Sequence, residues 1–175
     1  ITNHTADVIR YAQNQYTYRS KADAPYKDAN GRPFDDRAYA KGDRGFPPVN
    51  ANSFPYTPVT PGPPVKKPDW LNGPTMYHNR GDSTFAGENS EYGDFFGLDD
   101  LWTERPEVVR GMTKIYADWA HRTGVDGFRI DTVKHVNMEF WPQFVAGVEA
   151  RARRDFFMFG EVYSADPEFT STYVR

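Results

Sequence analysis

The spacing of apolar residues separates the last third of the chain from the rest. After Pro106, apolar side chains recur at helical spacing, at Val108, Met112, Ile115 and Trp119. Proline suits the first position of a helix, and glycine suits the position just after its end. The pattern therefore predicts a helix that begins at Pro106 and ends before Gly124.

Two short apolar segments and a second helix follow. The segments DGFRID (126–131) and FFMFGEV (156–162) have the length and composition of buried strands. Between them, Asn137 is suited to cap a helix that carries Phe140, Phe144 and Val148 on one face. The order helix, strand, helix, strand is typical of a parallel α/β sheet or barrel.

Residues 5–104 show no sustained periodicity. Nine of the 14 prolines lie between Pro47 and Pro74, which excludes long helices from that stretch. Tyr, Phe and Trp recur throughout, so the segment does not have the composition of a disordered region. We expect a large ordered insertion of short strands and turns, and a loop of this length in a compact domain is usually functional.

Composition narrows the classes of function. The chain has 21 Lys and Arg against 24 Asp and Glu, a net charge of −3, which argues against nucleic-acid binding and against attachment to a membrane surface. No apolar run is long enough for a transmembrane helix. The absence of cysteine excludes disulfides, thiolate metal sites and cysteine nucleophiles. Aromatic residues make up 16% of the chain, which suits either carbohydrate binding or a well-packed core.

Three charged residues stand out at the ends of the two predicted strands. Arg129 and Asp131 are two residues apart on one strand, so their side chains share a face and Arg129 favours the ionised form of Asp131. Glu161 ends the next strand after an apolar run, which favours the neutral acid. Adjacent strands are about 4.8 Å apart, close to the carboxyl separation of retaining glycosidases. The alternative is a buried Arg129–Asp131 ion pair that only holds the sheet together.

Four segments resemble the α-amylase family, glycoside hydrolase family thirteen. GFRIDTVKH (127–135) meets every fixed position of the family pattern G-x-R-x-D-x-x-K-H. ITNHT (1–5) is similar to the end of the family's first conserved region, and FGEV (159–162) to its third. GLDDLWTERPEV (97–108) is similar to the segment that closes the family's inserted domain. The four segments occur in the family's order and cover both ends of the chain.

The resemblance implies a role for each matching residue. Asp131 would be the nucleophile and Glu161 the acid/base, with Arg129 orienting Asp131. His4 would bind the sugar that is cleaved. Lys134 and His135 would contact the sugar on the leaving-group side.

The resemblance also implies a structural Ca²⁺ ion. Its ligands would be Asn3, the backbone carbonyl of His135 and the carboxylate of Asp100, and oxygen ligands of this kind suit Ca²⁺. The alternative for Asp100 is an exposed acid beside Asp99. The other histidines, His78 and His121, stand alone in the sequence, and we expect neither to be a ligand.

The implied fold is α/β, a partial TIM (β/α)₈ barrel comprising about strands 3 to 5 with a long, loop-rich insertion like the family's domain B. Residues 1–4 would end strand 3, residues 5–104 would form the insertion, and residues 105–175 would supply helix 3, strand 4, helix 4 and strand 5. The partner of the chain would be the remainder of the same barrel, including the family's third carboxylate. Without it, we expect the 175 residues alone to be inactive.

The implied activity is retaining hydrolysis of α-glucans such as starch, at α-1,4 or α-1,6 bonds. A transglycosylase of the same family would share all these residues, and a non-catalytic glycan-binding relative would share the fold. The presence of Arg129, Asp131 and Glu161 together disfavours the non-catalytic alternative. A polymeric substrate favours an extracellular protein, whose leader would precede residue 1.

Overall fold

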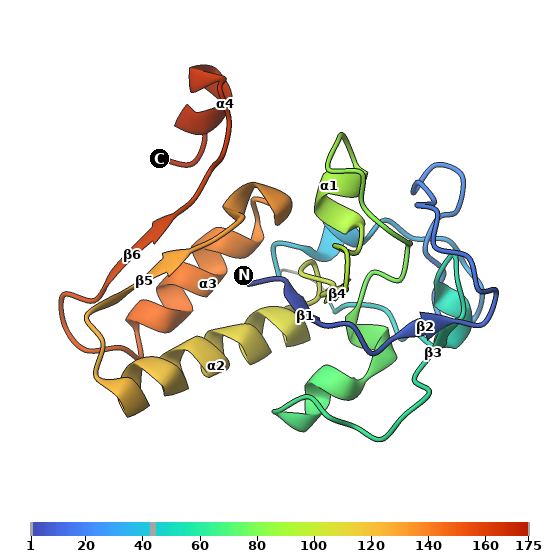
Figure 1. Ribbon diagram of the computed structural model, residues 1–175, viewed down its shortest axis with the longest axis horizontal. Coiled ribbons are helices and arrows are strands. Elements are labelled where there is room, and N and C mark those ends of the chain that lie inside the picture. Colours follow the sequence, from blue (N-terminus) through green and yellow to red (C-terminus); the bar gives the residue numbers. More distant parts are fainter. Residues whose placement is uncertain (1, 43–44, 175) are drawn as a thin grey trace.

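The computed structural model describes residues 2–42 and 45–174. Helices α2 (Pro106–Thr123) and α3 (Phe140–Glu149) lie beside strands β5 (Gly127–Ile130) and β6 (Phe157–Gly160) (Figure 1). The short helix α4 (Pro167–Ser171) follows β6. No helix within the described residues is long and apolar enough to cross a bilayer.

The predicted first helix is confirmed with both of its ends. Pro106 is the first residue of α2, and Gly124 adopts a left-handed conformation (φ 68°) immediately after it. The Gly124 N–H donates to the carbonyl of Ala120, which closes the last turn. Val108 and Met112, on the predicted apolar face, are buried, but Trp119 at the end of the same pattern is 58% exposed.

The two predicted strands pair in parallel, as the helix–strand order indicated. The register runs from Gly127 opposite Phe157 to Ile130 opposite Gly160. Helix α3 connects the strands and packs against α2, so this part of the chain is α/β.

The predicted cap of the second helix is wrong. Helix α3 begins two residues later than expected, with Glu139 at the N-cap position and no side-chain cap. The side-chain Nδ2 of Asn137 instead donates to Glu139 Oε2, and the backbone carbonyl of Asn137 accepts from the Phe140 N–H. Phe140, Phe144 and Val148 are fully buried on one face of α3, as the periodicity predicts.

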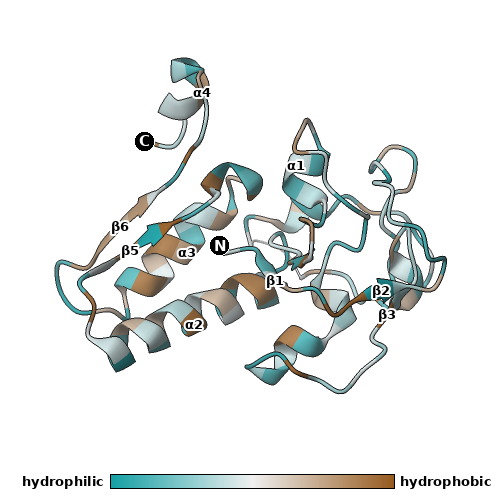
Figure 2. Cartoon of the chain, viewed as in Figure 1, coloured by the Kyte–Doolittle hydropathy of each residue, from teal (hydrophilic) through white to brown (hydrophobic). Residues whose placement is uncertain are grey.

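The expectation of two fully buried strands is also wrong. Phe157 is 65% exposed and Phe159 52% exposed, although Phe156 just before β6 is buried. Alternate side chains of a strand point to opposite faces, and β5 and β6 pair only with each other among the described residues. One face of β6 is therefore left bare, and Figure 2 shows hydrophobic colour along this strand.

Between residues 4 and 104 the described regular elements are short. Strand β1 (His4–Ala6) pairs antiparallel with β4 (Leu98–Asp100), and β2 (Arg10–Tyr11) pairs antiparallel with β3 (Pro58–Val59). The single α-helical turn α1 (Asn89–Tyr92) and four 3₁₀ turns complete the described elements, where only strands and turns were expected. The β1–β4 ladder brings the two ends of the predicted insertion together. The predicted domain boundaries stay predictions, and Ile1 lies outside the described residues.

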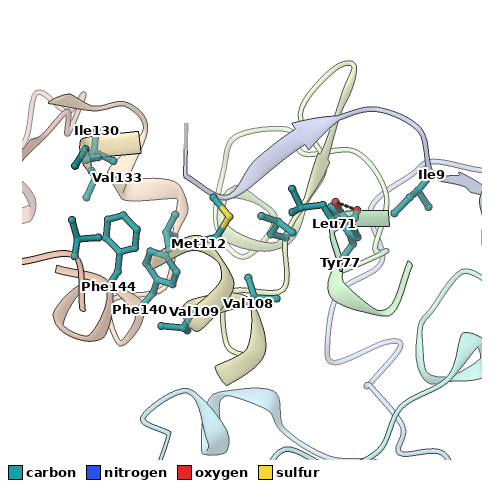
Figure 3. Packing of buried hydrophobic residues seen from close by; sticks show 14 of the residues in the cluster. Ile9, Leu71, Tyr77, Val108, Val109, Met112, Ile130, Val133, Phe140 and Phe144 are labelled. Atoms are coloured by element: carbon teal, nitrogen blue, oxygen red, sulfur yellow. Dashed lines mark hydrogen bonds between the residues drawn. The ribbon is translucent and has the colours of Figure 1, made fainter. Parts of the chain in front are cut away.

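One hydrophobic core joins both parts of the molecule. It runs from Ile130 and Val133 at β5, through Phe140 and Phe144 of α3 and Met112 of α2, to Ile9, Leu71 and Tyr77 in the first half of the chain (Figure 3). A second cluster surrounds the fully buried Trp102, with Tyr26 and Phe54. The shared core fixes the position of the irregular segment against α2, α3 and β5.

Candidate active site

The two predicted catalytic carboxylates meet at the carboxyl ends of β5 and β6. Continuing the strand register by one residue sets Asp131 opposite Glu161. Backbone hydrogen bonds extend the pairing past the strands, from Glu161 N–H to Ile130 O (2.7 Å) and from Val133 N–H to Glu161 O (3.1 Å). Both side chains therefore stand at one edge of the parallel pair, where α/β enzymes commonly have their sites.

Arg129 lies between the two carboxylates. One guanidinium nitrogen donates to Asp131 Oδ1, and the other lies 3.3 Å from Glu161 Oε1. Glu161 Oε2 also accepts from the Thr132 N–H (3.3 Å). The guanidinium fork thus holds both acids at once, whereas the sequence predicted a contact with Asp131 alone.

Exposure of these side chains corrects two expectations. The side chains of Arg129 and Asp131 are 52% and 43% accessible, so they are not a buried ion pair that merely holds a sheet. The side chain of Glu161 is 38% accessible, so the described residues by themselves do not supply the expected apolar surroundings of this acid. Glu161 is accessible because no described residue covers this face of β6, where Phe157 and Phe159 are also exposed to solvent.

Lys134 and His135 follow β5 on a 3₁₀ turn (Val133–His135). Lys134 Nζ donates to the carbonyl of Tyr163 (2.7 Å), just beyond Glu161. His135 Nδ1 lies 2.9 Å from both Oγ and O of Ser90, which ties this turn to α1. Burial lowers the pKa of His135 and favours the neutral ring.

His4 is a buried, neutral histidine on β1. Its ring packs against Phe95, with centroids 3.8 Å apart and the ring planes tilted by 31°, and both ring nitrogens are buried. Burial lowers the pKa of His4 to about 3. Its Nε2 lies 3.6 Å from Asp100 Oδ1, too far for a hydrogen bond. A neutral imidazole has one N–H donor and one acceptor nitrogen.

The three predicted calcium ligands come together. Asn3 Nδ2 donates to Asp100 Oδ1 (2.8 Å) and to the backbone carbonyl of His135 (2.9 Å). Asn3 Oδ1 is buried and has no partner. If the side-chain amide of Asn3 is flipped, its Oδ1 faces Asp100 Oδ1 and the carbonyl oxygen of His135. Three oxygens then point toward one another, and this donor set fits Ca²⁺. Asp100 is fully buried, which overturns the alternative of an exposed acid.

Burial and a charged neighbour set the ionisation of this group. Burial raises the pKa of Asp100 to about 7, although the adjacent His78 opposes the rise. A cation at Asn3 would favour the ionised carboxylate further. His121 lies exposed in the last turn of α2.

Sequence reasoning missed His78. Its ring is fully buried between Asp100 Oδ2 (2.7 Å from Nδ1) and Glu104 Oε2 (2.9 Å from Nε2), so it does not stand alone. Burial opposes protonation, but the two carboxylates outweigh it and raise the pKa of His78 to about 10. No sequence signal marks this group, because residues 78, 100 and 104 share no helix or strand on which their spacing has meaning.

Comparison with known proteins identifies relatives of the whole chain. The family described as "Alpha amylase, catalytic domain" matches residues 1–175. An alpha-amylase of Streptomyces lividans is 60% identical over 180 residues, covering 99% of this chain and 20% of that protein. An alpha-amylase of Geobacillus stearothermophilus is 34% identical over 88 residues, covering 50% of this chain and 16% of that protein. The chain therefore spans about a fifth of the length of such relatives.

Solved structures give a consistent result. An alpha-amylase of Geobacillus thermoleovorans in complex with acarbose superposes with a TM-score of 0.51 at 36% identity, covering 59% of this chain and 24% of that one. An Anoxybacillus alpha-amylase superposes with a TM-score of 0.53 at 38% identity and the same coverage.

Proposed function

The chain belongs to the alpha-amylase family, and from this premise we propose that it carries the nucleophile and the acid/base of a retaining α-glucan hydrolase. The observation that carries the proposal is the shared contact of Arg129 with Asp131 and Glu161. A guanidinium bound to both carboxylates holds them on one side of the parallel strands, facing the same space. Retaining glycosidases need two carboxyls in this relation.

The reaction proceeds in two displacements at the anomeric carbon. In the first, a carboxylate oxygen of Asp131 attacks this carbon, and Glu161 gives its proton to the departing glycosidic oxygen. In the second, Glu161 takes a proton from water, which attacks the same carbon and releases Asp131. Arg129 donates to Asp131 Oδ1 and so fixes the angle at which this carboxylate meets the sugar.

The surrounding residues position the substrate. In this proposal the neutral ring of His4 hydrogen-bonds the sugar that is cleaved, as the family resemblance implies. Lys134 and His135 contact the leaving-group side, because their turn directly follows Asp131 and is braced by Ser90 and Tyr163. The ligands expected here are α-glucan chains, and the structural relative that binds acarbose is consistent with a carbohydrate ligand.

Asn3, Asp100 and the carbonyl of His135 would hold a Ca²⁺ ion. The ion supplies positive charge and rigidity where β1, β4 and the turn after β5 meet. Asn3 directly precedes His4, Asp100 is the last residue of β4, and His135 directly follows Lys134. An ion bound to all three would therefore hold the candidate site against the irregular segment. The buried, unpartnered Oδ1 of Asn3 supports this assignment.

The parallel pair β5–β6 belongs to a (β/α)₈ barrel in this proposal, as strands 4 and 5. A hollow of about 500 Å³ opens beside it, lined by apolar residues that include Trp141, Met158 and Val162. Further strands of the same barrel would cover the exposed side chains of Phe157 and Phe159. These strands would also bring the third carboxylate of the site.

A chimera tests the proposal. Residues 1–175 replace the matching segment of the Streptomyces lividans relative, and starch hydrolysis is measured with the variants Asp131→Asn and Glu161→Gln. We expect an active chimera whose kcat falls by about 10²–10⁴-fold in Glu161→Gln and at least as far in Asp131→Asn. Asp118→Asn, which removes an exposed acid of α2 paired with Lys114, is the matched control and should leave kcat unchanged.

Two outcomes would contradict the proposal. An active chimera that tolerates both carboxylate changes would remove Asp131 and Glu161 from the reaction. A product released first as the β-anomer, followed by NMR, would show inversion. Oligosaccharides longer than the substrate would instead identify transglycosylation with the same residues. The 175-residue chain by itself should not hydrolyse starch, and hydrolysis by the purified chain would contradict its dependence on further strands.

A further inference from the structure

A second cluster of buried polar groups lies apart from the candidate active site. Asp36 comes from the 3₁₀ turn Asp36–Tyr39, His78 from the segment after the 3₁₀ turn Pro74–Met76, and Glu104 from the segment after β4. Their ligand-type atoms all lie within 4.8 Å of one another. The residues are 0–1% exposed, so water does not solvate their charges. The proposed glycosidase reaction uses none of them.

The hydrogen bonds of His78 leave one ring nitrogen facing an acceptor. Nδ1 lies 2.7 Å from Asp100 Oδ2, and the backbone N–H of His78 donates to the carbonyl of Asp100 (3.0 Å). With Nδ1–H donating to Asp100, the lone pair of Nε2 points at Glu104 Oε2, 2.9 Å away. Two acceptors at this distance need a proton or a metal ion between them. A carboxylate on the far nitrogen is the usual support of a metal-bound histidine.

A second, independent observation is the other oxygen of Glu104. Oε1 is buried and has no hydrogen-bond partner. Leaving a buried acceptor unmatched is unfavourable, and the effect is larger for a charged group. The neighbouring Asp36 is better matched, because its oxygens accept from Lys21 Nζ and from Trp102 Nε1 (2.8 Å). The unsatisfied hydrogen-bonding capacity of the cluster is therefore at Glu104 Oε1 and at the contact between His78 Nε2 and Glu104 Oε2.

We propose that Asp36, His78 and Glu104 form a closed binding site for a divalent transition-metal ion, with the ligand set of Zn²⁺. One imidazole nitrogen and carboxylate oxygens suit Zn²⁺, whereas Ca²⁺ prefers oxygen alone. Asp100 is the outer partner of His78, and its Oδ1 bonds Asn3. The site is therefore separate from the Asn3–Asp100–His135 group but shares one carboxylate with it.

The test is metal binding by the 175-residue chain. Because the site is closed, the chain is refolded with Zn²⁺ or Co²⁺ and excess Ca²⁺, and then passed through a desalting column. Bound metal is counted by mass spectrometry, and Co²⁺ coordination is followed by its visible absorption. We expect one Zn²⁺ per folded chain, with binding weakened at least about tenfold in Glu104→Gln and in His78→Gln. His121→Gln removes an exposed histidine and is the matched control.

The remaining outcomes are decisive against the proposal. Folded wild-type chain without bound Zn²⁺ would overturn it, and so would equal binding by wild type, His78→Gln and Glu104→Gln. Loss of binding in His121→Gln would assign the metal to the surface. Circular dichroism reports whether each variant folds. If His78→Gln does not fold, Glu104→Gln decides, because it keeps the shape of the side chain and changes only its charge and its free oxygen.

Discussion

At the scale of single residues, the same residue types have opposite states in different surroundings. Burial beside Phe95 lowers the pKa of His4, whereas two carboxylates raise the pKa of His78. The carboxylate of Asp100 is fully buried. The carboxylate of Asp131, which is paired with Arg129, is exposed to solvent. The state of each side chain follows from its neighbours in space. The residue type alone does not set it.

The neutrality of His4 predicts a loss of stability in acid. Its pKa is 6.5 in the unfolded chain and about 3 in the folded one. Below pH 6.5 the unfolded chain therefore binds a proton that the folded chain does not, and stability falls by about 1.4 kcal/mol per pH unit. His4→Gln lacks this effect. Between pH 7 and pH 5, wild type should lose about 2 kcal/mol more than His4→Gln.

Urea unfolding at the two pH values measures the difference. All other titrating groups are common to both chains, so the comparison isolates His4. Equal pH dependence of wild type and His4→Gln would contradict a neutral, buried ring.

At the scale of elements, the helices were predictable and the surroundings of the strands were not. Pro106, Gly124 and the periodic apolar residues between them are local signals, and α2 begins and ends where they indicate. The start of α3 was predicted less well, since Asn137 has the chemistry of a cap but its side chain bonds Glu139. The order of β5, α3 and β6 gave the parallel pairing. The exposure of Phe157 and Phe159 depends on what covers them, which local sequence does not state.

Gly127 controls the approach of the two strands. A Cβ atom at this position would lie 2.1 Å from the carbonyl oxygen of Phe157, a contact that the backbone must move to relieve. Gly127→Ala should therefore destabilise the chain by about 1–3 kcal/mol and disturb the pairing that sets Asp131 opposite Glu161. Gly62→Ala, where the added atom meets open space, is the matched control.

Thermal unfolding of the two variants gives the result. In the chimera, Gly127→Ala should also lower kcat, because the two carboxylates shift with the strands. A Gly127→Ala chain as stable as Gly62→Ala would show that the close contact carries no energy.

At the scale of the whole molecule, residues far apart in the sequence meet around Asp100. Its carboxylate bonds Asn3 and His78, and it lies in the ladder that joins β1 to β4. The carbonyl of His135 reaches the same place from the turn after β5. The irregular segment is thus tied to the site-bearing part of the chain at one point, and the shared hydrophobic core supports the junction.

Calcium should stabilise this junction. An ion that binds only the folded chain adds about 2.7 kcal/mol at 100 times its Kd, a rise in Tm of about 5–10 °C for a chain of this length. Asn3→Ala removes one ligand and should abolish most of the rise. Asp69→Asn changes an exposed carboxylate paired with Lys67 and should keep it.

Calorimetry after chelation and after addition of Ca²⁺ measures the increments. Each variant is compared with its own metal-free state, so a change in basal stability does not obscure the result. The same rise in Asn3→Ala as in wild type would contradict the calcium assignment.

The sequence by itself determined the helix and strand order and the family, because these rest on local periodicity and on short motifs such as GFRIDTVKH. The sequence also has Asp131 and Glu161 one βα unit apart, and the parallel pairing of β5 with β6 brings these two residues close together. The family resemblance also implied that Asn3 meets Asp100. Tertiary structure alone decided that Arg129 bridges both acids and that His78 lies among three buried carboxylates. Such contacts depend on how irregular segments cross in space, and no repeat of 2 or 3.6 residues encodes that crossing.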